Sequence, residues 1–402
     1  MLQHDQISPT RRAAAPNPHP RRRGYHARTA LGALILIVCG LSLWVYMSPA
    51  LIPESVDLAR ALFGPGPVAQ VEGWVFQAHD ALRQAHYQAT GTRNSVQWAA
   101  PAATLPPARP TAPRHAAPLP QPASPIPAAT AIPAAPAPPD IWSPFVSTAD
   151  GQAVLERAIT EPDPSRPYVQ AALVRIDLDR ARLHLIAGTS EPRSPVRVPR
   201  PGRIPAAEQR PGYLLAAFNG GFKAINGDFG MAVNGVALLP PKAGLATLAI
   251  YRDGRIRLGV WGQDLLPTPD LLAYRQNCPP LLDGGKLTTQ AEMDDPQLWG
   301  RTVRNKIATW RSGLGLSADG RYLIYAVGDG LTVPTLAQAL ASAGADRAMQ
   351  LDINSYWTRF VTYAPTGNGG GLVAQKLLDQ MFGDARQFLA PDSRDFFYIT
   401  AG

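Results

Sequence analysis

The chain has 402 residues and a formal net charge of +8, and its prolines are more frequent before residue 140 than after it. Residues 1–28 carry six arginines and one aspartate, whereas the part after residue 140 is only slightly basic. This distribution is typical of a membrane-topology signal, so we do not expect nucleic acid as a partner. The two cysteines, Cys39 and Cys278, are too far apart in the sequence to be expected to pair.

Residues 1–28 are predicted to form a disordered cytoplasmic tail, and residues 29–48 a transmembrane helix. The run from Ala30 to Met47 has no charged residue, and at ~1.5 Å per residue it spans ~27 Å, enough to cross a bilayer. Arginines on its N-terminal side place the rest of the chain outside the cytoplasm, in the periplasm or the extracellular space. A cleaved signal peptide, cut near Ser48-Pro49-Ala50, is the alternative; the length of the run favours an anchor.

Residues 49–98 form a juxtamembrane region with an amphipathic helix, which carries Val71, Trp74, Val75, Ala78 and Leu82 on one face. Three roles remain open for this helix: self-association through residues 67–90, contact with the membrane surface, and packing against the next domain. Residues 99–140 are a linker in which about two-thirds of positions 101–139 are Pro or Ala. This composition favours polyproline II, so we expect a stalk of on the order of 120 Å.

The last domain, residues 141–402, is predicted to be α+β, with mixed or antiparallel sheets and a few packed helices. Hairpins are expected at 231–239, 246–260 and 308–327, each around a turn that contains Asn-Gly or Asp-Gly. Other strands are predicted at 168–178, 182–186, 213–218, 348–351, 357–363 and 396–400. Helices are predicted at 151–160, between Thr332 and Gly344, and at 372–381.

His184 is the only histidine after residue 140. After residue 140 the chain therefore has too few histidines and cysteines for a Ser-His-Asp triad, a Cys-His pair or a zinc site. We expect no required cofactor; a metal, if one binds, would be Ca²⁺ or Mg²⁺ held by Asp352 and Asp329. The remaining inventory of carboxylates, amides and arginines suits hydrolysis of glycosidic or phosphodiester bonds.

These polar groups collect at strand ends and glycine-rich turns. Asp352 draws attention first, because a carboxylate at the end of a buried strand is costly unless it is solvated, paired or used. The candidate residues at these places are Asn219, Gly220, Lys223, Arg275, Asp283, Arg311, Asp329, Asp352, Asn354 and Trp357.

Five features occur in a fixed order: NGGF at 219–222, VNG at 233–235, PPLLDGGK at 279–286, Arg311 before a hairpin, and a strand–helix–strand stretch that ends in LD at 351–352. In this order they resemble the phosphodiester glycosidase family over about residues 168–400. The resemblance implies a mixed α/β fold and hydrolysis of a sugar-1-phosphate diester, with release of the sugar. Matching positions are Asn219, Gly220, Asp283, Arg311 and Asp352.

One departure stands out, because LDIN occupies the place of the family's LDGGGS motif. We expect the glycine-free loop to be bulkier and more extended. Two roles remain open: Asn354 replaces lost backbone donors while Tyr356 and Trp357 stack on a sugar, or Asn354 is a turn residue and Trp357 belongs to the core.

The predicted function is a membrane-anchored hydrolase that cleaves a glycosyl phosphodiester in a cell-envelope glycan or polymer. Its catalytic residues would be Asp352, Asp283 and Arg311, and its substrate-binding residues Asn219, Gly220, Lys223, Arg275, Asn354 and Trp357. The alternatives are a non-catalytic glycan-binding module and an envelope scaffold.

Overall fold

The computed structural model describes residues 58–60, 62–93, 96–99, 101–105, 142–293, 298–299, 307–366 and 370–402. Residues Ala59–Gly402 form one compact unit, and Met1–Leu58 are assigned to a second, of which only Leu58 is described. The predicted transmembrane run at 30–47 lies outside the described residues. Among the helices that are described, none has the length and apolar character needed to cross a membrane.

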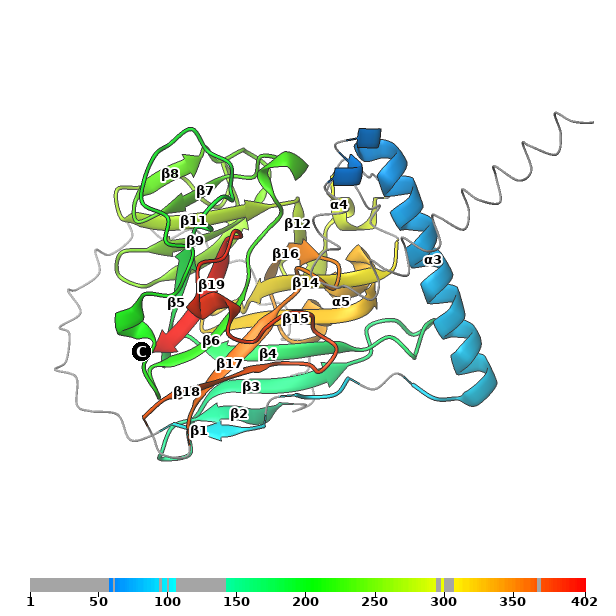
Figure 1. The fold of residues 1–402 in the computed structure, drawn as a ribbon, viewed down its shortest axis with the longest axis horizontal. Helices are drawn as coiled ribbons and strands as arrows, with labels where there is room; N and C mark the ends of the chain where they lie inside the picture. Colours follow the sequence, from blue (N-terminus) through cyan, green and yellow to red (C-terminus); the bar gives the residue numbers. More distant parts are fainter. Residues whose placement is uncertain are drawn as a thin grey trace, which may run out of the picture. The chain divides into compact units, whose positions relative to one another are not determined.

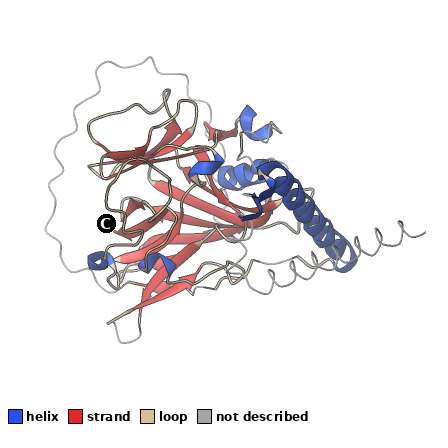
Figure 2. Ribbon diagram, turned by 45° about the horizontal axis from the view of Figure 1, so that its top comes forward, coloured by secondary structure: helices blue, strands red, loops and turns tan. Residues whose placement is uncertain are grey.

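Strands dominate the larger unit, with the two longer helices at one side of them (Figure 1, Figure 2). The largest sheet has nine strands, and all neighbours are antiparallel except β1 and β2. Its strands, in spatial order, are β1 (Ala103–Thr104), β2 (Ser143–Ser147), β3 (Ala153–Thr160), β4 (Ala171–Asp177), β15 (Tyr322–Leu331), β14 (Thr309–Leu316), β16 (Arg347–Ile353), β12 (Pro280–Asp283) and β13 (Lys286–Leu287).

Two five-stranded antiparallel sheets complete the strands. The first consists, in order, of β10 (Ile256–Val260), β9 (Ala246–Tyr251), β11 (Leu271–Asn277), β7 (Met231–Val233) and β8 (Val236–Leu239). The second consists of β18 (Leu372–Lys376), β17 (Phe360–Pro365), β6 (Leu214–Asn219), β19 (Phe396–Ala401) and β5 (Ala181–Ile186). The predicted hairpins β7–β8, β9–β10 and β14–β15 all form, and the prediction of a sheet-rich fold with few helices is confirmed.

The main hydrophobic core draws side chains from all three sheets, among them Val174 on β4, Phe218 on β6 and Leu248 on β9. A second core lies under the helix α5 (Val333–Ser342) and includes Leu336 and Leu340. These two cores pack the last residues of β6, the last residues of β16 and the first residues of β19.

The helix predicted between Thr332 and Gly344 is confirmed as α5. The Thr332 hydroxyl accepts a hydrogen bond from the Thr335 amide, and the Thr335 hydroxyl accepts one from the Thr332 amide, which makes a reciprocal cap. Gly344 follows the helix at a φ of +93°, as expected for a glycine just past a helix end. The other helices of the domain are short: α4 (Thr289–Glu292) and the 3₁₀ turns η2 (Ala206–Glu208), η3 (Ala224–Asn226) and η4 (Gln387–Leu389).

Two helix predictions are wrong. Residues 151–160 contain the strand β3, which pairs with β2 on one side and β4 on the other. Residues 372–381 begin with the strand β18, which pairs with β17 before the chain turns. Both segments are short and mostly apolar, and periodicity over ten residues does not separate a buried strand from a helix. Both segments form strands because neighbouring strands supply the partners for their backbone hydrogen bonds.

The helix α3 (Pro65–Thr90) packs on the domain with a face that the sequence did not single out. Gly73, Phe76, Asp80, Arg83 and Tyr87 are the residues turned inward: Phe76 and Tyr87 pack against the second core, and Arg83 pairs with Asp329 on β15. The apolar face predicted to mediate contacts lies on the opposite side and stays exposed.

Most of the predicted Pro/Ala-rich linker, residues 106–140, lies outside the described residues, so the stalk stays a prediction. At its N-terminal side, Ala103 on β1 pairs in register with Val146 on β2. A short piece of the predicted linker is therefore an edge strand of the nine-stranded sheet.

Candidate active site

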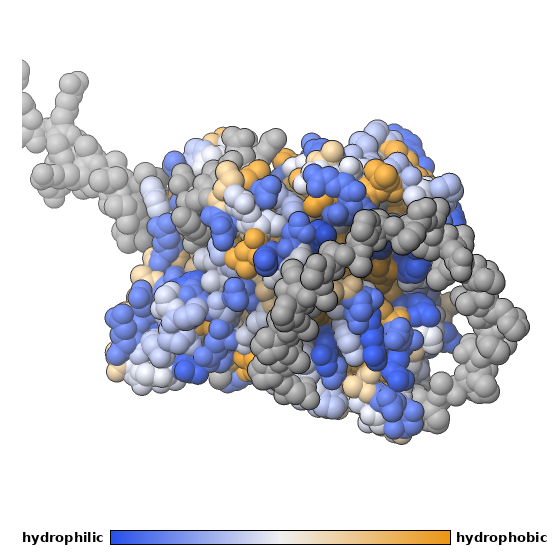
Figure 3. Space-filling model, turned by 180° about the vertical axis from the view of Figure 1, so that it is seen from behind, coloured by the Kyte–Doolittle hydropathy of each residue, from blue (hydrophilic) through white to orange (hydrophobic). Residues whose placement is uncertain are grey.

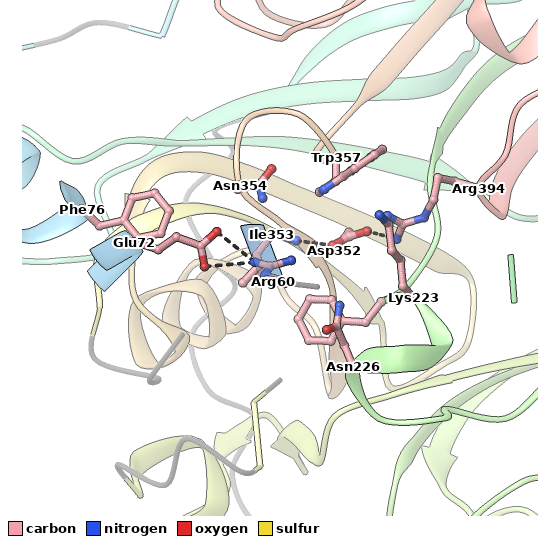
Figure 4. A pocket seen from close by; sticks show the side chains of 11 residues that line it. Arg60, Glu72, Phe76, Lys223, Asn226, Asp352, Ile353, Asn354, Trp357 and Arg394 are labelled. Carbon is pink, nitrogen blue, oxygen red and sulfur yellow. Dashed lines mark hydrogen bonds and ion pairs between the residues drawn. The ribbon is translucent and has the colours of Figure 1, made fainter. Parts of the chain in front are cut away.

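A small cleft of about 40 Å³ opens where β6 and β16 end and β19 begins. The domain lines it with Lys223, Asn226, Asp352, Asn354, Trp357 and Arg394, and we call it the Asp352 cleft (Figure 4). A second hollow adjoins it and shares Asp352, Trp357 and Arg394. These three side chains therefore stand between two accessible spaces, as groups that meet a bound molecule would.

Asp352 lies near the end of β16 and is bound by a cation from a distant part of the chain. Its Oδ2 accepts a hydrogen bond from Nη2 of Arg394, and its Oδ1 accepts one from the Ile353 amide at 2.9 Å. Both side chains of the ion pair are nearly buried, with 10% of Arg394 and 8% of Asp352 exposed. Burial raises the pKa of Asp352 above its ordinary value, although the Arg394 guanidinium opposes the shift.

Two cations lie over the indole ring of Trp357. The guanidinium carbon of Arg394 is 4.5 Å from the ring centroid, and Nζ of Lys223 is 5.0 Å from it. Lys223 follows β6 of a five-stranded sheet, and Trp357 follows β16 of the nine-stranded sheet, so this cluster joins residues from two sheets. A carboxyl group with a raised pKa thus faces two positive charges and an aromatic surface.

The segment Asn219–Phe222 is held against the strand β19 by a buried ion pair. Asp395 accepts hydrogen bonds from Nε of Arg275 at 2.8 Å and from Nη2 at 3.1 Å, and both side chains are 1% exposed. The same aspartate accepts from both glycine amides, through its main-chain oxygen for Gly220 and its Oδ2 for Gly221. Both glycine amides are therefore bound by Asp395, although Gly220 was predicted to bind substrate.

Gly220 is required here by close approach. An added Cβ would lie 1.9 Å from Oδ2 of Asp395 and 2.7 Å from its main-chain oxygen. Arg394 donates to the Gly221 carbonyl at 3.0 Å. This loop thus fixes the same arginine that binds Asp352.

Asn219 has its amide fully used by the protein. Its Nδ2 donates to the Gly220 carbonyl and to Oγ of Ser312, each at 3.0 Å. Its Oδ1 accepts from the Tyr325 hydroxyl and from the Arg359 amide, each at 2.9 Å. Asn219 lines the second hollow, but its hydrogen bonds tie strand ends together instead of pointing to a ligand.

Asn354 keeps a glycine-like conformation in the loop where the family motif has glycine. Its φ is +65°, in the left-handed region that Asn tolerates better than most residues. Its Oδ1 accepts from the Tyr356 amide at 3.0 Å, which closes a local turn. The expectation of a more extended backbone is therefore wrong at this position, and the amide oxygen is used within the loop.

Two of the three predicted catalytic side chains do not join the cleft. Arg311 stands beside Ile353 in the sheet, but its guanidinium donates to the Leu331 and Ile307 carbonyls and to Gln350, deep in the core. Its burial lowers its pKa to about 10. Asp283 lies on the β12–β13 hairpin, 64% exposed, and pairs with Arg347 at 2.6 Å. The structure therefore does not bring Asp283, Arg311 and Asp352 into a shared cavity.

The residues predicted as metal ligands do not fit a metal. Asp352 is bound by Arg394, and Asp329 lies 3.1 Å from Arg83 of α3. Among the described residues there is no group of three or more His, Cys, Asp or Glu side chains that could hold an ion. A divalent cation would have to displace a guanidinium from each carboxylate, so we derive no step that involves one.

Sequence reasoning missed Arg394 and Asp395, although a signal was available. They form a charged pair immediately before the predicted closing strand, as Asp352 stands at the end of its own. It also missed a contribution from the N-terminal segment. Arg60, Glu72 and Phe76 form one wall of the Asp352 cleft, and the Glu72 carboxylate accepts from Nη2 of Arg60 at 2.9 and 3.0 Å (Figure 4).

Comparisons with known proteins identify part of the chain. Residues 213–354 match the sequence model of the phosphodiester glycosidase family. No curated protein matches the chain.

Among solved structures, the zebrafish N-acetylglucosamine-1-phosphodiester alpha-N-acetylglucosaminidase catalytic domain, auto-inhibited by its pro-peptide, is similar at 16% identity and a TM-score of 0.38, over 62% of this chain and 84% of that one. A hypothetical protein from Synechocystis has 11% identity and a TM-score of 0.32, over 62% of each chain. An exported protein from Burkholderia pseudomallei has 14% identity and a TM-score of 0.31, over 57% of this chain and 74% of that one.

The match includes Asn219, Lys223, Arg275 and Asp352 and ends at Asn354, so Arg394 and Asp395 lie beyond it. It begins at the strand β6 and includes α5 and β16, the elements that carry the ordered motifs. The resemblance that the ordered motifs predicted is thus confirmed for residues 213–354, which match the sequence model of that family.

Proposed function

We propose that this chain hydrolyses a glycosyl phosphodiester in the Asp352 cleft. The observation that carries the proposal is the nearly buried Asp352–Arg394 pair, which stands between two hollows with Lys223 and Trp357 beside it. A carboxyl group whose pKa is raised by burial is better suited to donate a proton in a reaction than a free carboxyl group. Guanidinium and ammonium groups are the side chains that bind phosphate oxygens.

In this reaction the bond between the anomeric carbon and the bridging phosphate oxygen breaks. Water adds its hydroxyl to the carbon, and its proton leaves through Asp352 or is taken by the phosphate monoester. The departing phosphate keeps its negative charge, so Arg394 and Lys223 would stabilise it as it forms. Trp357 would offer its indole to the sugar ring.

A second carboxylate for the reaction must line the Asp352 cleft. Asp283 lies on an exposed hairpin, and Asp395 does not line this cleft. Glu72 of α3 does line it, although it is paired with Arg60. Glu72 would therefore take the place predicted for Asp283.

We propose further that the enzyme is anchored in a membrane by residues 30–47, with the domain outside the cytoplasm. The support is the uncharged run of the sequence and its arginine flank. In that compartment the substrate would be a glycosyl phosphodiester of an envelope glycan or polymer.

The test is turnover of a nitrophenyl sugar-phosphodiester by the full chain in detergent. Asp352→Asn should lower kcat/KM by roughly 10²-fold or more, the usual range for loss of an acid–base group. Asp283→Asn is the matched control, since it removes an exposed carboxylate and should leave the rate unchanged. Equal rates for the wild type and Asp352→Asn would remove Asp352 from the mechanism.

One observation favours a second candidate, a glycan-binding module without activity. The loop from Ile353 to Tyr356 has no glycine, and Trp357 presents an aromatic surface in the cleft. Binding of a glycan without product, weakened more by Trp357→Ala than by Asp352→Asn, would support this module and contradict the hydrolase.

A further inference from the structure

The helix α3 has two faces with opposite roles. Its inward face contributes Glu72 and Phe76 to the wall of the Asp352 cleft, and Gly73 lies so close to the domain that an added Cβ would be 3.3 Å from Ile307. Half a turn away lies the outer stripe, which we define as Val71, Trp74, Val75, Ala78 and Leu82.

The outer stripe is apolar and exposed. Val71 is 54% exposed, Trp74 67%, Val75 60% and Leu82 70%. The residues follow one another at helical spacing, and none of them carries a charge. Elsewhere the surface seen from behind is mainly hydrophilic, with small separate hydrophobic patches (Figure 3). A continuous exposed apolar face on a helix indicates a surface that something else covers.

Chain length points to what covers it. The ten residues Ser48–Asp57 connect the apolar run that ends at Met47 to the first described residue, Leu58. Fully extended, such a connection reaches about 35 Å at most. If the run spans a bilayer, Leu58 lies within that reach of the lipid surface, and α3 follows at Pro65. A helix with Trp, Val and Leu on one face is suited to lie in that interface.

A second copy of the chain is a weaker occupant. A stable protein interface uses about 20–30 residues on each side, whereas the stripe offers five side chains over roughly three helical turns. Two such stripes packed together fall well short of that size.

We propose that the outer stripe of α3 docks on the lipid surface of the membrane in which the chain is anchored. The proposal rests on the anchor included in the proposed function. It has a consequence for the substrate, because Glu72 and Phe76 on the inner face line the Asp352 cleft. The cleft would then lie about one helix diameter, 10–12 Å, from the headgroups. Substrates attached at the membrane surface would reach it without leaving that surface.

The experiment uses the full chain with Cys39→Ser, reconstituted in vesicles of phosphatidylethanolamine and phosphatidylglycerol. An environment-sensitive dye is attached at Val75→Cys, or at Arg193→Cys as control, whose side chain is 77% exposed on another part of the domain. Lipids that carry a quencher at the headgroup boundary should remove most emission of the dye at position 75 and little at position 193. The buried Cys278 should stay unlabelled in both.

Three results are informative. Flotation of the protein with the vesicles tests the anchor separately: failure to float would overturn the anchoring and the docking that rests on it, but not the proposed hydrolysis. Flotation without quenching at position 75 overturns the docking. Energy transfer between labelled copies without quenching would mean that a second chain covers the outer stripe, and it would also overturn the docking on lipid.

A functional arm uses Val75→Asp with Leu82→Asp, both outside the cleft. If the stripe docks, this variant should turn over a soluble nitrophenyl substrate as fast as the parent. It should lose most of its rate on a glycosyl phosphodiester embedded in the vesicles. Equal loss on both substrates, or no loss on either, would contradict the docking.

Discussion

Replacing Arg394 by methionine should destabilise the domain strongly, because Asp352 would keep its burial and lose its partner. The two side chains are 10% and 8% exposed. Removing one partner of a pair buried to this degree costs about 3–5 kcal/mol of unfolding free energy. Arg394 also donates to the Gly221 carbonyl at 3.0 Å, and that hydrogen bond would be lost as well.

The structure supplies a matched control in Arg347 and Asp283. Their N–O distance is 2.6 Å, but the side chains are 30% and 64% exposed. A pair so open to solvent contributes about 0–1 kcal/mol. Arg347→Met should therefore cost much less than Arg394→Met, although each variant removes one guanidinium beside a carboxylate.

The assay is urea unfolding of the full chain in detergent at neutral pH, for Arg394→Met, Asp352→Asn and the double variant. The double variant should cost clearly less than the sum of the two single costs, with a coupling of roughly 1–3 kcal/mol, because neither charge is then left unpaired. Additive costs, or an Arg394→Met cost no larger than that of Arg347→Met, would refute the reasoning.

Further predictions follow from the packing. Gly220→Ala places a Cβ 1.9 Å from a buried carboxylate oxygen and should lower stability by several kcal/mol or prevent folding. Gly66→Ala has nothing within 4 Å of the added Cβ and should raise stability by about 0.5–1 kcal/mol. Equal effects of the two variants on thermal unfolding would contradict the contact at Gly220. Cys278 has its pKa raised to about 12 by burial, so in a Cys39→Ser background no thiol should react with an aromatic disulfide until urea is added. Burial lowers the pKa of His184 below its ordinary 6.5, so the unfolded chain takes up a proton first as the pH falls. Stability should drop below about pH 6.5, and His184→Gln should flatten that part of the curve; an unchanged slope would count against it.

Local signals in the sequence were sufficient for several elements. Thr332 and Gly344 bound α5 as predicted, because a helix end is decided by hydrogen bonds between residues three or four positions apart. The Asn234-Gly235 turn formed its hairpin for the same reason. The polar end of a buried strand also pointed to Asp352 correctly as a group that needs a partner.

Other features depended on which strands the fold places side by side. Residues 153–160 became a strand because β2 and β4 lie on both sides of them. The apolar pattern of α3 was recognised, but not that its other face packs on the domain.

Sequence patterns alone were enough to predict the hairpins, the helix α5 and the similarity of residues 213–354 to a known family. Three features could be found only in the folded chain: Arg394 binds Asp352 across 42 positions, Arg311 turns into the core, and Asp283 stays on the surface. Charge pairing acts over a few ångströms, and the order of strands in three sheets determines which distant side chains come that close.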